Sequence, residues 1–205
     1  KLLEILSLAE EYEIPTHFVH RVDARSTGII YGLLRQLRPT SILEIGTSCG
    51  GLTCAIQYAL TRNGGSSTFV TSEMEEGVRN EAKRNVEEKC GQAPIFIGKI
   101  KENLDKVPAQ LDCLFIDTNH DLENCKWYLE NIIPRVKKGG LVWVHDWSAR
   151  EVDGEVLYEG GNFEEINHLI QLYKTDELPL EKVFWTWEND ELRKKTVASS
   201  FWIKK

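Results

Sequence analysis

Short apolar runs that alternate with helix-periodic stretches are the feature of this sequence that most restricts its fold. In the clearest helical stretch, apolar residues at positions 52, 55, 56, 59 and 60 follow the spacing of an amphipathic helix. Runs that are apolar along their whole length belong to strands buried on both faces, which is typical of a parallel sheet covered by helices. The pattern predicts a doubly wound α/β fold whose first five strands lie at residues 41–45, 67–72, 93–98, 111–117 and 140–146.

The last third of the chain changes this pattern. Apolar spacing over residues 163–174 predicts a helix, and the runs KVFWTW and VASSFWI, joined by the polar ENDELRKK, predict an antiparallel hairpin. The hairpin would close one edge of the sheet, so we expect a mostly parallel, seven-stranded sheet. Earlier in the chain, an apolar stripe from Leu122 to Val136 predicts one continuous helix, which Gly139 and Gly140 would end.

Charge and composition disfavour several classes of protein. A net charge of −7 and a pI of about 5.4 argue against nucleic acid as the main partner, because binding phosphates requires a basic surface. No apolar run approaches the roughly 20 residues that cross a membrane. The five cysteines, without a CxxC pair, indicate reduced thiols in a cytoplasmic protein rather than a disulfide framework or a structural zinc site. The first residues show no secretion signal, and the missing initiator methionine leaves an upstream segment open.

Acids and histidines follow two of the predicted strands. Asp117 and His120 come after the fourth run, in FIDTNHD, and His145 and Asp146 end the fifth, in LVWVHDW. Ligands of open α/β sheets bind at the carboxyl ends of strands. We therefore expect these four side chains to form one site, in which an imidazole removes a proton and the carboxylates bind a metal ion. The structural alternative is that Asp117 or Asp121 caps the next helix.

A glycine-rich segment, EIGTSCGG at residues 44–51, joins the first strand to the next helix. Glycine permits a tight turn and lets a ligand approach the backbone, and the helix start offers free N–H groups. The segment departs from the dinucleotide pattern GxGxxG, because Ser48 occupies the position of the second glycine. Glu73, at the end of the second strand, is placed to accept hydrogen bonds from the ribose hydroxyls of an adenosine-containing ligand. The alternative for Glu73 is an exposed acid at a helix N-terminus.

The spacing E-x-G-x-x-x-G and the segments LDCLFIDTNHD and LENIIPRVKKGGLVWVHDW together resemble class I S-adenosylmethionine (SAM)-dependent methyltransferases. The resemblance covers residues 25–147. It is strongest to small-molecule O-methyltransferases of the methyltransferase-24 type, and extends to macrolide-sugar and, more distantly, catechol O-methyltransferases. It implies a Rossmann-like fold and SAM as the cofactor. The residues that would bind SAM are Glu44, Gly46, Thr47, Ser48, Gly50, Glu73 and Asp117.

The resemblance also implies a mechanism for O-methylation of a small-molecule hydroxyl. In this group an Asp after the fourth strand and two adjacent residues after the fifth bind a divalent metal, and the corresponding residues here are Asp117, His145 and Asp146. The expected metal is Mg²⁺ or Mn²⁺. A basic residue three positions after the first Asp takes the proton of the acceptor, so His120 and Asp117 are the predicted catalytic residues.

Two positions depart from the family pattern. His145 stands where the sugar-modifying enzymes have an acid. Because Mg²⁺ prefers oxygen ligands, an imidazole there favours Mn²⁺, Fe²⁺ or Zn²⁺, or else places His145 outside the metal ligands. Lys99 stands where methyltransferases often have an acid near the adenine, so adenine recognition must differ or rely on backbone and apolar contacts. Two other functions stay open, a catalytically silent cofactor-binding domain and a nicotinamide-dependent oxidoreductase.

Because the sequence shows no repeat, linker or low-complexity tract, residues 1–205 are interpreted as a single domain. It would comprise N-terminal helices at residues 1–38, a cofactor-binding core at 39–147, and a lid segment, helix and closing hairpin at 148–205. Trp147 is expected to line the acceptor pocket, whereas His17, His20 and His168 are interpreted as structural. The expected partner is a small hydroxyl-bearing molecule and not a nucleic acid or a membrane. A homo-oligomer is compatible with the sequence.

Overall fold

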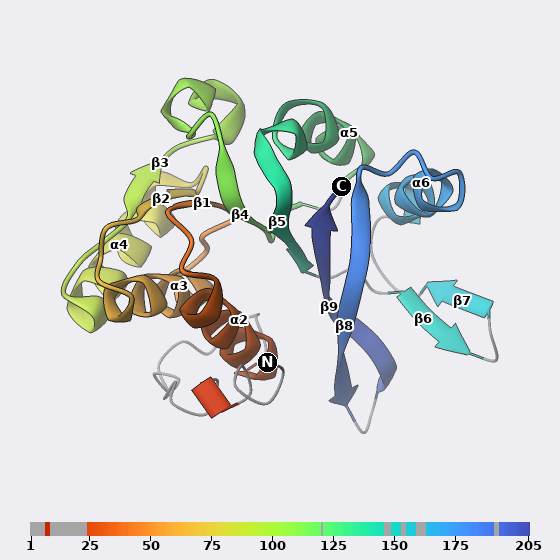
Figure 1. Cartoon of the computed structure of the whole chain (residues 1–205), viewed down its shortest axis with the longest axis horizontal. Helices are drawn as coiled ribbons and strands as arrows, with labels where there is room; N and C mark the ends of the chain where they lie inside the picture. Colours follow the sequence, from red (N-terminus) through yellow and green to blue (C-terminus); the bar gives the residue numbers. More distant parts are fainter. Residues whose placement is uncertain are drawn as a thin grey trace.

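Seven strands form one central sheet (Figure 1). The computed structural model of the chain describes residues 7–8, 24–119, 121–145, 149–152, 155–158, 163–190 and 193–205. The strands of the sheet are β1 (Ser41–Ile45), β2 (Thr68–Ser72), β3 (Ile95–Ile97), β4 (Leu111–Ile116), β5 (Val136–His145), β8 (Leu180–Asp190) and β9 (Arg193–Lys204). Their order is β3-β2-β1-β4-β5-β9-β8, with β1 to β5 parallel and β9 antiparallel to both β5 and β8. The predicted doubly wound sheet with a C-terminal antiparallel hairpin is confirmed.

Helices cover both faces of this sheet (Figure 1). They are α2 (Ala24–Leu37), α3 (Gly51–Arg62), α4 (Glu76–Cys90), α5 (Leu122–Asn131) and α6 (Phe163–Lys174). Alternate strand residues point to opposite faces. Thus Phe115 and Trp143 pack in one apolar cluster with residues of α2 and α3, whereas Leu114 and Val142 pack in a second with residues of α5 and α6. Each such side chain contributes about 1.5–3 kcal/mol through its burial.

The helix predicted to run to Val136 is shorter in the structure. Helix α5 ends at Asn131, and a 3₁₀ turn, η3 (Ile133–Arg135), with Pro134 in its first turn, leads into β5. Proline has no N–H to continue the helical hydrogen bonds, and its ring disfavours the α conformation of the residue before it. The two glycines expected to end the helix lie inside β5 instead.

The C-terminal third also contains more strand than its sequence predicted. Strands β8 and β9 extend into the polar segment that was expected to connect them, because the backbone pairing of a hairpin continues through polar residues near its turn. A separate two-stranded sheet, β6 (Ala149–Val152) with β7 (Glu155–Tyr158), lies in the segment without periodicity that was interpreted as a lid. Among the described residues, no helix is both long and apolar enough to span a lipid bilayer.

The strand order creates a crevice at the carboxyl ends of the central strands. Strand β1 lies between β2 and β4, so consecutive connections leave the middle of the sheet in opposite directions. The carboxyl ends of β1, β2 and β4 therefore meet at a topological switch point, where open α/β sheets bind their ligands. The glycine segment, Glu73 and Asp117 follow these three strand ends.

Candidate active site

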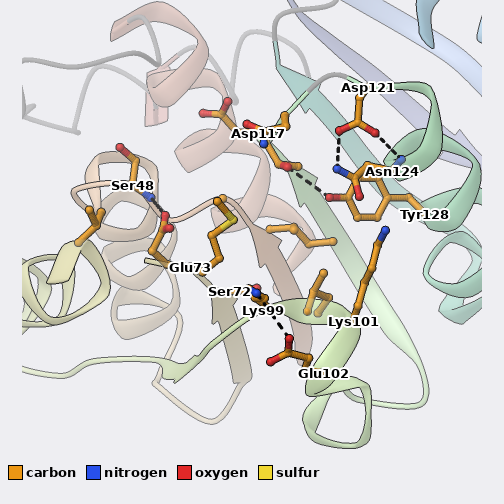
Figure 2. Close-up of a pocket in the computed structure, with 17 residues that line it drawn as sticks. Ser48, Ser72, Glu73, Lys99, Lys101, Glu102, Asp117, Asp121, Asn124 and Tyr128 are labelled. Atoms are coloured by element: carbon orange, nitrogen blue, oxygen red, sulfur yellow. Dashed lines mark hydrogen bonds and ion pairs between the residues drawn. The ribbon is translucent and has the colours of Figure 1, made fainter. Parts of the chain in front are cut away.

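A cavity of about 1070 Å³ opens at the switch point (Figure 2). Ligand pockets usually measure about 300–1,000 Å³, so this one has room for a nucleoside-containing cofactor together with part of a second molecule. Of the predicted cofactor-binding residues, Gly46, Ser48, Glu73 and Asp117 line the cavity. The other three do not line it: Glu44 is buried within β1, and Thr47 and Gly50 belong to the loop that follows.

Gly46 allows the β1 loop to pass directly over the end of β4. Its φ is +96°, and a Cβ atom built there would lie 1.6 Å from the backbone oxygen of Asp117. The Gly46 N–H donates to the carbonyl of Ser72, 2.9 Å away, and the Asp117 N–H donates to the carbonyl of Ile45 at 2.8 Å. These contacts join the ends of β1, β2 and β4, and any side chain at position 46 would force them apart.

Glu73 connects the end of β2 to the glycine loop. Its Oε2 accepts a hydrogen bond of 2.9 Å from the backbone N–H of Ser48 (Figure 2). Its Oε1 accepts one of 3.0 Å from the backbone N–H of Glu75. A carboxylate oxygen has two lone pairs, so each oxygen can accept a further bond from a ligand hydroxyl. The side chain is half-buried at the cavity wall, which keeps both interpretations of Glu73 open, ribose binding and loop support.

Glu44 lies at the centre of a buried polar network behind the loop. Its Oε2 accepts hydrogen bonds from the hydroxyls of Thr53, at 2.7 Å, and Thr71, at 2.6 Å, and Thr71 is also 2.5 Å from the hydroxyl of Thr47. Since Thr71 donates to Glu44, Thr47 donates to Thr71. Complete burial raises the pKa of Glu44 to about 8, against the lowering effect of the two hydroxyl donors. The Glu44 carboxyl is therefore mostly protonated at neutral pH.

Asp117 and His145 come together from the ends of β4 and β5. The distance from Asp117 Oδ1 to His145 Nδ1 is 3.3 Å. The His145 side chain is 3% exposed and its ring lies against Trp143, with 5.4 Å between ring centroids, whereas Asp117 is 22% exposed and faces the cavity. The packing holds the imidazole in one orientation beside the carboxylate.

Several predicted residues lie outside the described part of the chain. They are His120, Asp146, Trp147, His17 and His20. Asn119 and Asp121, which flank His120 in the sequence, both line the cavity. His168, interpreted as structural, is half-buried on α6 and does not line this cavity.

One face of α5 lines the cavity and was missed in the sequence. Asp121, Asn124 and Tyr128 are spaced by three and four residues, which places them on the same side of the helix. Asp121 caps the helix through the Asn124 N–H, at 2.8 Å, and the Tyr128 hydroxyl lies 3.3 Å from that of Thr118 (Figure 2). The sequence does contain a signal for this face, because polar residues recur at helical spacing directly after the acid that ends β4.

Lys99, the departure from the family pattern, also lines the cavity. Its Nζ lies 3.6 Å from the Oε1 of Glu102 in the 3₁₀ turn η1 (Ile100–Glu102), and both side chains are largely exposed (Figure 2). An acid that lines the cavity, Glu102, therefore lies three residues after the position where the family often has one.

A sequence model of a protein family, described as a methyltransferase domain, matches residues 43–147. This match spans just over half of the 205 residues and includes the glycine loop, Glu73, Asp117 and His145. The chain belongs to this methyltransferase family. The predicted resemblance is confirmed, and membership of the family favours a methyltransferase over a nicotinamide-dependent oxidoreductase. Among curated proteins, none matches the chain significantly.

Solved structures of methyltransferases share the fold of the whole chain. A structure of an O-methyltransferase from Bacillus cereus in complex with SAH has a TM-score of 0.68 and 19% identity, covering 100% of this chain and 90% of that one. An O-methyltransferase from Streptomyces achromogenes involved in tomaymycin synthesis, in complex with SAM, has a TM-score of 0.67 and 16% identity, covering 100% and 89%. A putative O-methyltransferase from Klebsiella pneumoniae has a TM-score of 0.67 and 19% identity, covering 100% of this chain and 89% of that one. At these identities the likeness concerns the fold.

Proposed function

We propose that this methyltransferase transfers a methyl group from SAM to a hydroxyl of a small molecule. The observation that carries the proposal is the common cavity of the glycine loop, Glu73 and Asp117, with His145 directly behind Asp117. When bound, SAM supplies a methyl group that is already activated by its sulfonium. The residues of the chain then align the acceptor with the methyl group and make its oxygen a better nucleophile. The similarity to O-methyltransferase structures supports the choice of oxygen as the acceptor atom.

We include a divalent metal ion in this proposal. Carboxylate and imidazole are donors suited to Mn²⁺, Fe²⁺ and Zn²⁺, and those of Asp117 and His145 are adjacent. Within the described ranges no group of three such donors occurs, and Asp146, the third proposed ligand, lies outside them. A metal held here would lower the pKa of the acceptor hydroxyl. Without it, the buried His145 imidazole would orient the Asp117 carboxylate, which faces the cavity.

The proposed function is tested by methyl transfer from isotope-labelled SAM to a panel of catechols, phenols and sugars. Transfer to at least one hydroxyl acceptor is expected. The absence of transfer to every acceptor, in protein that binds SAH, would favour a catalytically silent cofactor-binding domain. The absence of both binding and transfer would overturn the proposal.

Replacing Glu73 by alanine is expected to weaken SAH binding by about 10–100-fold. The estimate follows from the net loss of one hydrogen bond to a charged group, worth roughly 1.5–3 kcal/mol. Calorimetric titration of SAH measures the effect. Glu75→Ala is the matched control, because Glu75 is an exposed neighbouring acid that does not line the cavity. Equal affinities in the two variants would assign Glu73 to loop support alone.

Replacing His120 by alanine is expected to lower the turnover rate by about 10²–10⁴-fold, the usual contribution of a general base. SAH affinity should stay nearly unchanged, because the base acts on the acceptor. Initial rates of methyl transfer between pH 6 and pH 8 measure the effect. His168→Ala, which removes a histidine on α6, should keep the normal rate. Normal turnover of the His120 variant would move the proton transfer to His145 or to a metal-bound acceptor.

A further inference from the structure

Three cysteines gather behind the glycine loop, where α3 contacts α4. Cys49 belongs to the loop, Cys54 lies in the first turn of α3, and Cys90 is the last residue of α4. The Cys90 thiol donates to the backbone oxygen of Cys54, with Sγ and O 3.7 Å apart, and each of the two thiols shifts the pKa of the other. Cys54 is buried and Cys90 is partly exposed. A small oxidant from solvent can therefore reach Cys90, with Cys54 already in contact with it.

The same helix contact supports the glycine loop. The Nδ2 of Asn85, on α4, donates to the backbone oxygen of Cys49 at 3.0 Å. A Cβ atom at Gly50 would lie 3.2 Å from Cγ2 of Val86, so the loop packs closely on α4. A displacement of α4 relative to α3 would reach the loop that lines the cavity.

We propose that Cys54 and Cys90 form a reversible disulfide on exposure to a peroxide, and that this bond weakens cofactor binding. An S–S bond is about 2.05 Å long and holds the two Cα atoms about 4.4–6.8 Å apart, so its formation would fix the end of α4 against the start of α3. Asn85 and Val86 would move with the helix and change the support of the loop. The effect on affinity rests on the proposed function, whereas the formation of the bond does not.

The chemistry balances with hydrogen peroxide as the oxidant. Interaction with the adjacent Cys54 side chain lowers the pKa of the Cys90 thiol, which favours the thiolate as the attacking group. The Cys90 sulfur forms an S–O bond as the peroxide O–O bond breaks, giving a sulfenic acid and hydroxide. The Cys54 sulfur then forms the S–S bond, and the S–O bond breaks as water leaves. In total, two thiols lose two electrons and two protons, and one peroxide becomes two waters.

To test this, the whole chain is treated with hydrogen peroxide, its free thiols are blocked, and its disulfides are mapped by mass spectrometry. SAH is then titrated into the reduced and the oxidised protein. A Cys54–Cys90 disulfide that dithiothreitol reverses is expected, with SAH binding about tenfold weaker in the oxidised form, since the loss of a single hydrogen bond to the ligand weakens binding by about that much. The oxidised Cys90→Ser and Cys54→Ala variants should keep the affinity of their reduced forms. Cys125→Ser, a change on α5 outside the cluster, should still respond to peroxide.

Different outcomes test the disulfide pair, its effect on SAH binding and the proposed function separately. A disulfide through Cys49, or oxidation of Cys90 without a partner, would overturn the assigned pair. The expected disulfide with unchanged SAH affinity would overturn its effect on the cofactor. Failure of the reduced protein to bind SAH would instead count against the proposed function, because the mapped disulfide does not depend on SAH.

Discussion

The Asp117→Asn variant is expected to lose methyl transfer by about 10²–10⁴-fold, in the range for removing an activating group from a site. Asparagine keeps the size of the side chain and the backbone contacts to Ile45 and Gly46, so the fold should survive. It removes the carboxylate that faces the cavity and contacts His145. Initial rates with labelled SAM, alongside calorimetric titration of SAH, should show a loss in turnover far larger than the loss in affinity.

Asp112→Asn is the matched control for this experiment. Asp112 lies on the same strand at the opposite end, where it accepts a hydrogen bond from Lys137 at 2.8 Å. That variant should lose some stability and keep its turnover rate. If the Asp117 variant turned over at the normal rate, Asp117 would be reassigned to a structural role at the crossing of β1 and β4.

Chelation separates two roles for the Asp117 carboxylate. If it holds a metal, excess EDTA should abolish transfer in the unaltered protein, and added Mg²⁺ or Mn²⁺ should restore it. A preference for Mn²⁺, Fe²⁺ or Zn²⁺ would support ligation by His145, because these ions accept imidazole more readily than Mg²⁺ does. Full activity in EDTA, with no metal in the purified protein, would refute the metal proposal. Asp117, which faces the cavity and contacts His145, would then remain as the group that acts on the proton of the acceptor.

Replacing Glu44 by glutamine is expected to remove a pH dependence of several kcal/mol from the free energy of unfolding. Burial raises the pKa of Glu44 from its ordinary 4.5 to about 8 in the folded protein. Between these values the folded state keeps a proton that the unfolded state releases, so the free energy of unfolding falls as pH rises. At roughly 1.4 kcal/mol per pH unit, the whole interval corresponds to about 5 kcal/mol, lost by pH 8.

Urea unfolding from pH 5 to pH 9 measures this dependence. The glutamine variant has no proton to lose, and its oxygen can still accept from Thr53 and Thr71. It should therefore show a flatter profile and exceed the unaltered protein in stability above pH 8. Glu81→Gln, which changes an exposed acid on α4, should leave the profile unchanged. An identical slope for the Glu44 variant would show that this carboxyl is not protonated in the folded state.

The location of the site at the carboxyl ends of the strands was predictable, because the position of each strand follows from local sequence patterns. The apolar runs and helix periodicity identify the strands and the crossover helices, and right-handed crossovers leave few ways to order a parallel sheet. The carboxyl ends of neighbouring strands then meet without further information. Gly46, Glu73 and Asp117 could therefore be assigned to one cavity from their positions after three strands.

The ends of several elements were predicted less accurately. The helix after Asp121 was expected to reach Val136, and Pro134 ended it earlier. The hairpin strands were longer than their apolar runs, since backbone pairing does not require apolar side chains. Boundaries of this kind follow from a balance among hydrogen bonds, caps and packing, which apolar spacing does not contain.

What the sequence by itself determined was the family, the doubly wound sheet with its closing hairpin, and the strand ends where the chemistry-bearing residues gather. Only the tertiary structure showed that Glu44 is buried behind the loop, where burial raises its pKa. The sequence had predicted that Glu44 binds the cofactor, as it had for Gly46. The contact of Cys54 with Cys90 likewise appears only in the folded chain, and only the structure gives the 3.3 Å between Asp117 and His145, which the sequence had already placed in one site. Each of these pairs is separated by 28 or 36 positions in the sequence. Local preferences decide the conformation of a segment, but burial and contact between distant residues depend on how the segments pack.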